Sequence, residues 1–271
     1  MLVVDAQVHI WERGTPPANH QQSPLSAEGL LQEMQSAGVD RAILVPPLWD
    51  PGVNDYSIQA ATRFPEQFAV MGLVDLNAPM ERDAFREWLL RNRLLGVRIA
   101  FNNSILRANL AVGLADWLWA SAEAAGAPLM ILAPQLSALI GMIARRHPGL
   151  RIVVDHMGIP RGMKAPNAFQ HLPELIALAK YDNVAVKMGG VPNYADNDAY
   201  PYRSLHGYLR QVIDAFGPMR CFWASDLSRL RGPYAECVGM FREGLDWLSE
   251  EERAAILGRG LAKWLNWPPD R

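Results

Sequence analysis

The chain contains little cysteine. Only two of its 271 residues are cysteines, Cys221 and Cys237, and they fall in a predicted strand and a predicted helix. Neither belongs to a paired spacing of the kind that holds a metal ion, so cysteine chemistry is not indicated. Reduced cysteines are typical of cytoplasmic proteins, and we expect a cytoplasmic location.

Runs of positive charge and long apolar stretches are also absent. The formal net charge is −2 and no basic run occurs, which argues against nucleic acid as a partner. No apolar stretch approaches the length of a membrane span, and the chain begins with a predicted strand and not with a signal peptide, so no membrane association is expected. The expected partner is a small-molecule substrate, and the sequence leaves open whether the chain forms a homo-oligomer.

No shift in composition and no low-complexity segment marks a linker. Hydrophobic residues make up 50% of the chain and charged residues 20%, which is enough apolar material for a large core. Because α/β barrels of this length commonly form one unit, residues 1–271 are predicted to be a single domain.

Apolar runs alternate with segments of helical spacing. Predicted strands occupy residues 3–11, 41–45, 68–73, 96–100, 129–132, 151–154, 184–187 and 221–224. Predicted helices occupy residues 26–38, 56–63, 83–91, 114–125, 136–146, 169–179, 205–216, 234–245 and 250–265. Strands that are apolar on both faces and alternate with helices favour a parallel sheet, and eight of them favour a closed (β/α)8 or TIM barrel. In such a barrel the active site lies at the C-terminal ends of the strands.

The first strand combines polar and apolar residues in alternation. With a period of two, Asp5, Gln7 and His9 share one face, which we expect to point into the barrel, and the apolar residues between them face the helices. An antiparallel edge strand is the alternative. The polar loop that follows, residues 12–24, is longer than a simple connection and is a candidate active-site loop.

Three further strand ends carry titratable residues. His9, His156 and Asp226 follow or end strands one, six and eight, so the barrel would bring them to one rim. A carboxylate beside two imidazoles can activate water, and we predict these three as catalytic residues. Each has a purely structural alternative, such as a core histidine or a helix cap. Asp155 is expected to face away from His156 and to bind backbone amides.

The same rim suggests residues that hold the substrate. The predicted substrate-binding residues are Gln7, Trp49, Arg98, Lys187, Tyr194 and Arg203. Several arginines near one rim, including Arg107, Arg161 and Arg229, favour a substrate with carboxylates. The aromatic residues favour a cyclic or aromatic acid, and the loop 191–203 is predicted to act as a lid or a specificity wall.

Three motifs resemble those of a known family. Asp5-Ala6-Gln7-Val8-His9, Asp155-His156-Met157-Gly158 and Trp223-Ala224-Ser225-Asp226 resemble signatures of the amidohydrolase superfamily. More narrowly, they resemble the amidohydrolase-related group that includes pyrone-dicarboxylate and sugar-acid lactonases. The first motif of the family usually reads Asp-x-His-x-His, whereas this chain has Gln7, and its fifth strand ends in Ala133-Pro134 without a histidine or lysine.

These losses favour hydrolysis without a metal, as the resemblance to the pyrone-dicarboxylate branch implies. The alternative is one divalent metal such as zinc held by His9, His156 and Asp226. The predicted function is hydrolysis of a lactone or activated ester of a carboxylated small molecule. In this hypothesis Asp226 is the base, and the two histidines with Gln7 polarise the carbonyl. A metal-dependent decarboxylase of an aromatic acid, a lactone isomerase and a non-catalytic binding protein remain as alternatives.

Overall fold

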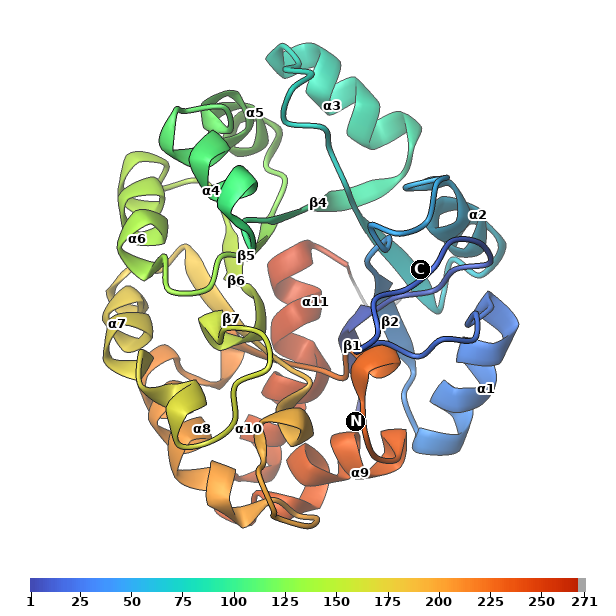
Figure 1. Cartoon of the computed structure of the whole chain (residues 1–271), viewed down its shortest axis with the longest axis vertical. Coiled ribbons are helices and arrows are strands. Elements are labelled where there is room, and N and C mark those ends of the chain that lie inside the picture. The colour runs from blue at the N-terminus through green and yellow to red at the C-terminus, as the bar shows by residue number, and fades with distance from the viewer. Residues whose placement is uncertain (268–271) are drawn as a thin grey trace.

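The computed structural model describes residues 1–267 as a (β/α)8 barrel, which confirms the predicted fold (Figure 1). The strands are β1 Val4–Val8, β2 Arg41–Leu44, β3 Phe68–Gly72, β4 Leu94–Ala100, β5 Leu129–Leu132, β6 Ile152–Val154, β7 Val184–Gly189 and β8 Cys221–Ala224. They pair in parallel in chain order from β1 to β8. The backbone N–H of Asp226 donates to the carbonyl oxygen of Gln7 at 3.1 Å, so the end of β8 lies beside β1 and the ring is nearly closed.

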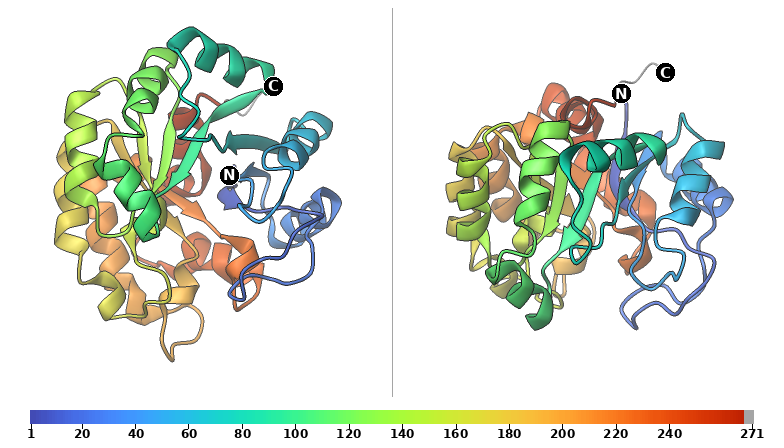
Figure 2. Two further views of the ribbon diagram at one scale, coloured as in Figure 1. Left: turned by 45° about the horizontal axis from the view of Figure 1, so that its top comes forward. Right: turned by 90° about the horizontal axis from the view of Figure 1, so that it is seen from above.

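A ring of helices surrounds the strands (Figure 2). The α-helices are α1 Ala27–Ala37, α2 Asp55–Arg63, α3 Arg82–Arg91, α4 Ser104–Ala111, α5 Asp116–Ala125, α6 Ser137–Arg146, α7 Leu172–Ile176, α8 Arg203–Phe216, α9 Tyr234–Gly239, α10 Glu250–Ala254 and α11 Gly260–Leu265. Short π-helical segments, Met240–Gly244 and Ala255–Arg259, continue α9 and join α10 to α11. None of the helices within residues 1–267 has the length and apolar character that a membrane crossing requires.

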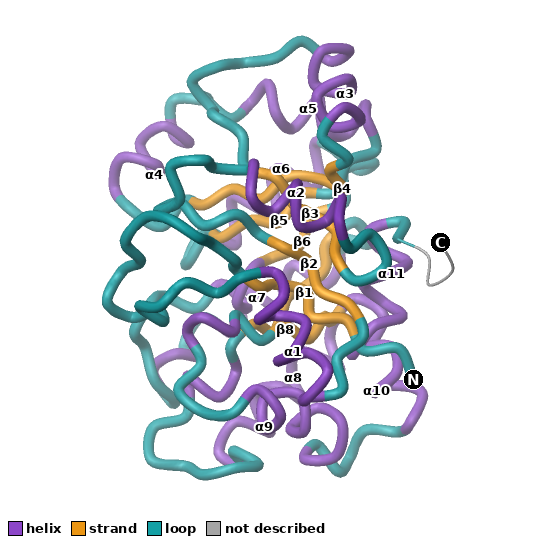
Figure 3. Tube along the Cα trace, turned by 90° about the vertical axis from the view of Figure 1, so that its right-hand side faces the viewer, coloured by secondary structure: helices purple, strands orange, loops and turns teal. Residues whose placement is uncertain are grey.

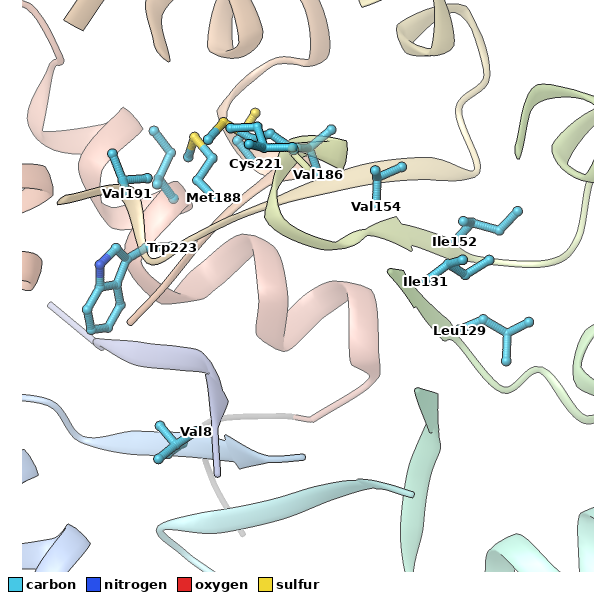
Figure 4. Packing of buried hydrophobic residues seen from close by; sticks show 14 of the residues in the cluster. Val8, Leu129, Ile131, Ile152, Val154, Val186, Met188, Val191, Cys221 and Trp223 are labelled. Carbon is cyan, nitrogen blue, oxygen red and sulfur yellow. The ribbon is translucent and has the colours of Figure 1, made fainter. Parts of the chain in front are cut away.

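Alternate residues of each strand pack on opposite sides of the barrel wall. Leu129 and Ile131 of β5 and Ile152 and Val154 of β6 belong to the large cluster that the helices cover, and Figure 4 shows these side chains along their strands. A second cluster fills the barrel interior with the intervening residues; among its members are Ile43, Met71, Met130, Val153, Ala185 and Phe222. The interior is thus a packed core beneath the rim.

Helix α11 closes the barrel at the end opposite the C-terminal ends of the strands. Its Leu261 and Leu265 pack in the interior cluster with Val4 and Phe222, which lie near the beginnings of β1 and β8. Figure 1 shows α11 across the centre of the ring, and Figure 3 shows the longer loops gathered on one side of the barrel.

The first strand does not keep the alternation that its sequence predicts. Its pairing with β2 shifts register between Asp5 and Val8, which is the signature of a bulge. Val4 and Ala6 therefore point into the barrel and Val8 points toward the helices. The prediction that Asp5 shares a face with Gln7 is wrong, because the Asp5 carboxylate accepts a hydrogen bond from the hydroxyl of Tyr234 on α9 at 2.7 Å.

Candidate active site

The three predicted catalytic residues meet at one rim. His9 follows β1, His156 follows β6 and Asp226 follows β8. The Nε2 atom of His9 lies 3.4 Å from Oδ1 of Asp226, and Nε2 of His156 lies 3.9 Å from Oδ2. All three residues are buried.

Left-handed backbone turns place two of these side chains over the barrel. His156 has φ 54° and Asp226 has φ 51°, values that non-glycine residues rarely adopt. Such a turn directly after a strand costs roughly 1–3 kcal/mol and is found mainly at functional sites. Gly189 on β7 makes room for His156, because a Cβ atom there would come within 2.7 Å of the imidazole Nδ1.

The amide of Gln7 lies at the centre of the cluster. Its nitrogen is 3.2 Å from Nε2 of His156 and 3.5 Å from Nε2 of His9. The same nitrogen donates to Oδ1 of Asp226 at 3.3 Å. The side-chain amide thus contacts every predicted catalytic residue.

Backbone carbonyls determine the tautomer of both imidazoles. Nδ1 of His9 lies 2.6 Å from the carbonyl oxygen of Val45, and Nδ1 of His156 lies 3.3 Å from that of Gly189. A carbonyl oxygen only accepts hydrogen bonds, so in both neutral rings the proton sits on Nδ1. Each Nε2 then presents a lone pair toward the Gln7 amide.

Burial and neighbouring charges define the protonation states. Burial would raise the pKa of Asp226, but its interactions with His9, His156 and Arg229 outweigh burial and hold this pKa well below its ordinary value. Burial lowers the pKa of His156 to about 4, even though Asp226 acts in the opposite direction. At neutral pH the cluster therefore contains a carboxylate and a neutral His156.

A buried ion-pair network lies beneath the cluster. Oδ1 of Asp155 forms an ion pair with Nζ of Lys187 at 2.7 Å, and Oδ2 accepts from Nε of Arg98 at 3.2 Å. Burial would raise the pKa of Asp155, but these two cations outweigh burial and lower it. The expectation that Asp155 binds backbone amides is wrong, because its strand position points the carboxylate into the barrel. The Lys187 ammonium also donates to Oε1 of Gln7 at 3.0 Å.

A cavity of about 330 Å³ opens beside His156. Its lining consists of Asn102, Asn103, Arg107, Leu132, Pro134, His156, Ile159, Pro160, Arg161, Tyr194 and Arg229. The volume is within the usual range for a small-molecule site. A larger hollow of about 610 Å³ lies near Met1 and Leu2, at the opposite rim, and contains none of the catalytic candidates.

The cavity carries excess positive charge. Nη1 of Arg229 pairs with Oδ2 of Asp226 at 3.1 Å, but its Nε is buried and has no hydrogen-bond partner within residues 1–267. Burial and the adjacent Arg229 lower the pKa of Arg161. Arg107 is held by backbone carbonyls of Phe101 and Pro134. This arrangement suits an anionic group.

The loop after β1 adds a histidine that sequence reasoning missed. His20 is buried, and its Nδ1 lies 2.9 Å from Oγ of Ser228. Its ring is 5.9 Å from that of His9 and 4.6 Å from that of Trp49, which itself lies 5.7 Å from His9. The predicted active-site loop therefore does cover the cluster. A histidine within this polar loop was the signal that could have found it.

The predicted substrate-binding residues fall into three groups. Tyr194 lines the cavity, and Gln7 and Trp49 contact the catalytic candidates. Arg98 and Lys187 lie in the buried network below. Arg203 is exposed at the start of α8 and lies 3.9 Å from Asp246, so the structure does not bring it to the cavity.

The donor atoms around Gln7 do not suit a divalent metal. Within residues 1–267, no group of three or more histidine, cysteine or acidic residues is arranged to hold a metal ion. In addition, the Gln7 amide directs its N–H group between His9, His156 and Asp226, where a metal would need a lone pair.

Comparison with known proteins gives a consistent picture. The sequence profile of the Amidohydrolase family matches residues 4–260, almost the whole chain. The L-fucono-1,5-lactonase of Burkholderia ambifaria is 27% identical over 257 residues, which cover 86% of this chain and 83% of the relative.

Solved structures share the fold at lower identity. An amidohydrolase from Burkholderia multivorans with bound zinc has a TM-score of 0.80 at 22% identity, covering 99% of this chain and 100% of that chain. A probable 2-pyrone-4,6-dicarboxylic acid hydrolase from Acinetobacter baumannii, with citric acid bound, has a TM-score of 0.78 at 12% identity, covering 98% and 100%.

Proposed function

The chain belongs to the Amidohydrolase family, and we propose that it is a hydrolase that opens a lactone or an activated ester of a carboxylated small molecule. The observation that carries the proposal is the Asp226 carboxylate, grouped with two imidazole lone pairs beside a cavity that contains Arg161 and Arg229. The names of the fuconolactonase and pyrone-dicarboxylate relatives support the same class of substrate.

In the proposed mechanism Asp226 is the general base. Its carboxylate is ionised at neutral pH, so it can accept a proton from a water molecule that attacks the substrate carbonyl carbon. The Nε2 lone pairs of His9 and His156 help to orient this water. When the ring C–O bond breaks, the proton returns from Asp226 to the departing oxygen.

The tautomers change the expected role of the two imidazoles. A neutral ring with its proton on Nδ1 cannot donate from Nε2, so His9 and His156 are not suited to polarise the carbonyl in the ground state. We assign that role to Arg229, which lines the cavity and has an unused N–H donor. Arg161 would hold a substrate carboxylate.

The two alternative activities, a metal-dependent decarboxylase and a lactone isomerase, require different features of the site. A metal-dependent decarboxylase needs a well-held cation, which the donor set around Gln7 does not favour. A lactone isomerase would use the same residues as the hydrolase but would release no acid. This difference allows an experiment to separate them.

The test is proton release by the purified protein with a panel of lactones, before and after exhaustive chelation. The panel should include L-fucono-1,5-lactone, 2-pyrone-4,6-dicarboxylate and simple cyclic esters without a carboxylate. Proton release that survives chelation supports the proposal. Substrate loss without proton release would favour the isomerase, and activity that depends on added zinc or manganese would contradict the metal-free mechanism.

A further inference from the structure

The orientation of the Gln7 amide is imposed by a buried lysine. Lys187 has no exposed surface, and its Nζ contacts Oδ1 of Asp155 at 2.7 Å, Oε1 of Gln7 at 3.0 Å and Sδ of Met130 at 3.0 Å. An ammonium group donates three hydrogen bonds and accepts none. The side of the amide that faces Lys187 must therefore be the carbonyl oxygen.

This constraint turns the amide nitrogen toward the catalytic cluster. The opposite orientation would place the amide N–H group against the ammonium, so the hydrogen bond between Lys187 and Gln7 would be lost and the amide N–H group would face another donor. A buried donor without an acceptor is strongly destabilising. Burial lowers the pKa of Lys187, but the ion pair with Asp155 at 2.7 Å opposes burial and favours the ammonium form. Arg98 on the other carboxylate oxygen helps to fix the position of Asp155.

The distances from the Gln7 amide nitrogen to its three neighbours resemble the spacing between ligand atoms of a zinc site. Nε2 of His9, Nε2 of His156 and Oδ1 of Asp226 each lie 3.2–3.5 Å from the amide nitrogen. Ligand atoms at the corners of a tetrahedral zinc site are about 3.3 Å apart, given metal–ligand distances near 2.0 Å. The fourth corner, however, is an N–H donor, which repels a cation and offers no lone pair.

We propose that Lys187 is a positioning residue that holds the Gln7 amide with its N–H group toward His9, His156 and Asp226, and so keeps divalent cations out of the site. The two N–H donors of this amide nitrogen, shared among the three neighbouring acceptors, then link them in place of a metal. A structural role for Lys187 alone, as a partner of Asp155, would not make metal binding depend on it.

Zinc binding by the full-length protein tests this inference without any substrate. The purified chain would be stripped with a chelator, dialysed against Zn²⁺, and assayed by isothermal titration calorimetry and elemental analysis. Two variants change the amide corner, which is the position of the Gln7 amide nitrogen beside His9, His156 and Asp226. Gln7→Glu replaces the N–H donor with an oxygen ligand that Lys187 can still hold, and Lys187→Met frees the amide to turn its oxygen inward.

The expected result is no specific zinc in the wild type and about one Zn²⁺ per chain in Gln7→Glu and in Lys187→Met. Met130→Leu is the matched control, because it removes another contact of the same ammonium and should bind no zinc. Adding His9→Asn to Gln7→Glu should abolish the gained site, which separates it from binding at the surface.

Two results would overturn the inference. One is a wild-type zinc site that disappears in His9→Asn, and the other is a failure of both amide-corner variants to gain zinc. A folded Lys187→Met that binds no zinc while Gln7→Glu does would also overturn the positioning role of Lys187. Lys187→Met leaves Asp155 paired one-to-one with Arg98. Should it still not fold, the double variant Lys187→Met/Asp155→Asn, which removes both charges of the buried pair, replaces it in the test. Because no substrate is used, this outcome is independent of whether the chain hydrolyses lactones.

Discussion

At the scale of single residues, Asp226 combines the charge and the surroundings that a general base requires. Its carboxylate is ionised at neutral pH, buried, and held by Arg229 on one oxygen while the other faces the cluster. We expect Asp226→Asn to lower kcat/KM for a lactone substrate by about 10²–10⁴-fold, the usual contribution of a positioned base. Circular dichroism should show an intact fold.

Asp246→Asn provides the control for this prediction. Asp246 is exposed and lies 3.9 Å from Arg203, outside the cavity, so its amide variant should keep wild-type activity. An Asp226→Asn variant with comparable turnover would contradict the assignment of the base.

Arg161 should determine the preference for a carboxylated substrate. It lines the cavity beside Arg229, and its interaction with a substrate carboxylate would be a charge-assisted hydrogen bond. We expect Arg161→Gln to raise KM for a carboxylated lactone by about 10–100-fold with a smaller effect on kcat. A lactone without a carboxylate should show almost no change.

Arg203→Gln is the comparison variant here. Arg203, like Arg161, follows a strand in sequence, but it is exposed and directed toward Asp246. Steady-state kinetics on both substrates would measure the effect. Equal losses on the charged and the uncharged lactone would show that Arg161 does not recognise the carboxylate.

At the scale of the elements, the bulge in β1 links the strand to the helix that follows β8. It directs Asp5 outward, where its carboxylate accepts hydrogen bonds from the Tyr234 hydroxyl at 2.7 Å and from the backbone N–H of Ser225 at 2.9 Å. Ser225 directly precedes Asp226. The bulge therefore ties the position of the proposed base to that of β1.

Removal of the Tyr234 hydroxyl should weaken this connection. Tyr234→Phe leaves one acceptor of a buried carboxylate without its partner, and we expect the free energy of unfolding at pH 7.5 to fall by about 1–3 kcal/mol. Urea denaturation measures the change. Tyr208→Phe is the control, because the Tyr208 ring stacks on Phe169 with ring centroids 4.2 Å apart, and it should lower the free energy of unfolding much less. Equal decreases in the two variants would argue against the role of the Asp5 contact.

The elements that sequence reasoning predicted are those with strong periodicity. The runs that became β2 to β8 and the α-helices other than α4 carry local patterns, and strand ends led directly to His156 and Asp226. The sequence of β1 gives no sign of the bulge, because its polar and apolar residues alternate without a break. The face of the strand on which Asp5 lies could therefore not be predicted. Helix α4 was also missed; its Ile105 is exposed, and little of its pattern indicates burial.

The sequence shows which residues follow a strand but not where their side chains point, and this was the main limit on predicting the site. Arg161 and Arg203 both follow strands, but only the structure distinguishes the one that lines the cavity from the one at the start of α8. Likewise, the sequence placed Lys187 near the rim. Its contacts with Asp155 and Gln7 depend on three strands that are far apart in the chain.

At the scale of the whole molecule, buried titratable groups make stability depend on pH. Burial lowers the pKa of His156 and the pKa of His20 from 6.5 to about 4, whereas burial raises the pKa of Asp5 from 3.8 to about 6. Between pH 6.5 and 4 the unfolded chain therefore binds protons at two histidines that the folded protein does not, which lowers stability as the pH falls. Asp5 has the opposite effect between pH 6 and 3.8, because there the folded protein binds the additional proton.

Two variants should change this dependence in opposite directions. Asp5→Asn removes the group that offsets the histidines, so its free energy of unfolding should fall more steeply between pH 6 and 4 than that of the wild type. His20→Asn removes one of the two histidines. The free energy of unfolding of this variant should therefore fall less steeply between pH 6 and 4 than that of the wild type. Each proton changes the slope by at most about 1.4 kcal/mol per pH unit. Urea denaturation at pH 7, 6, 5 and 4.5 measures the slopes, and a change of the same sign in both variants would contradict this account of the buried charges.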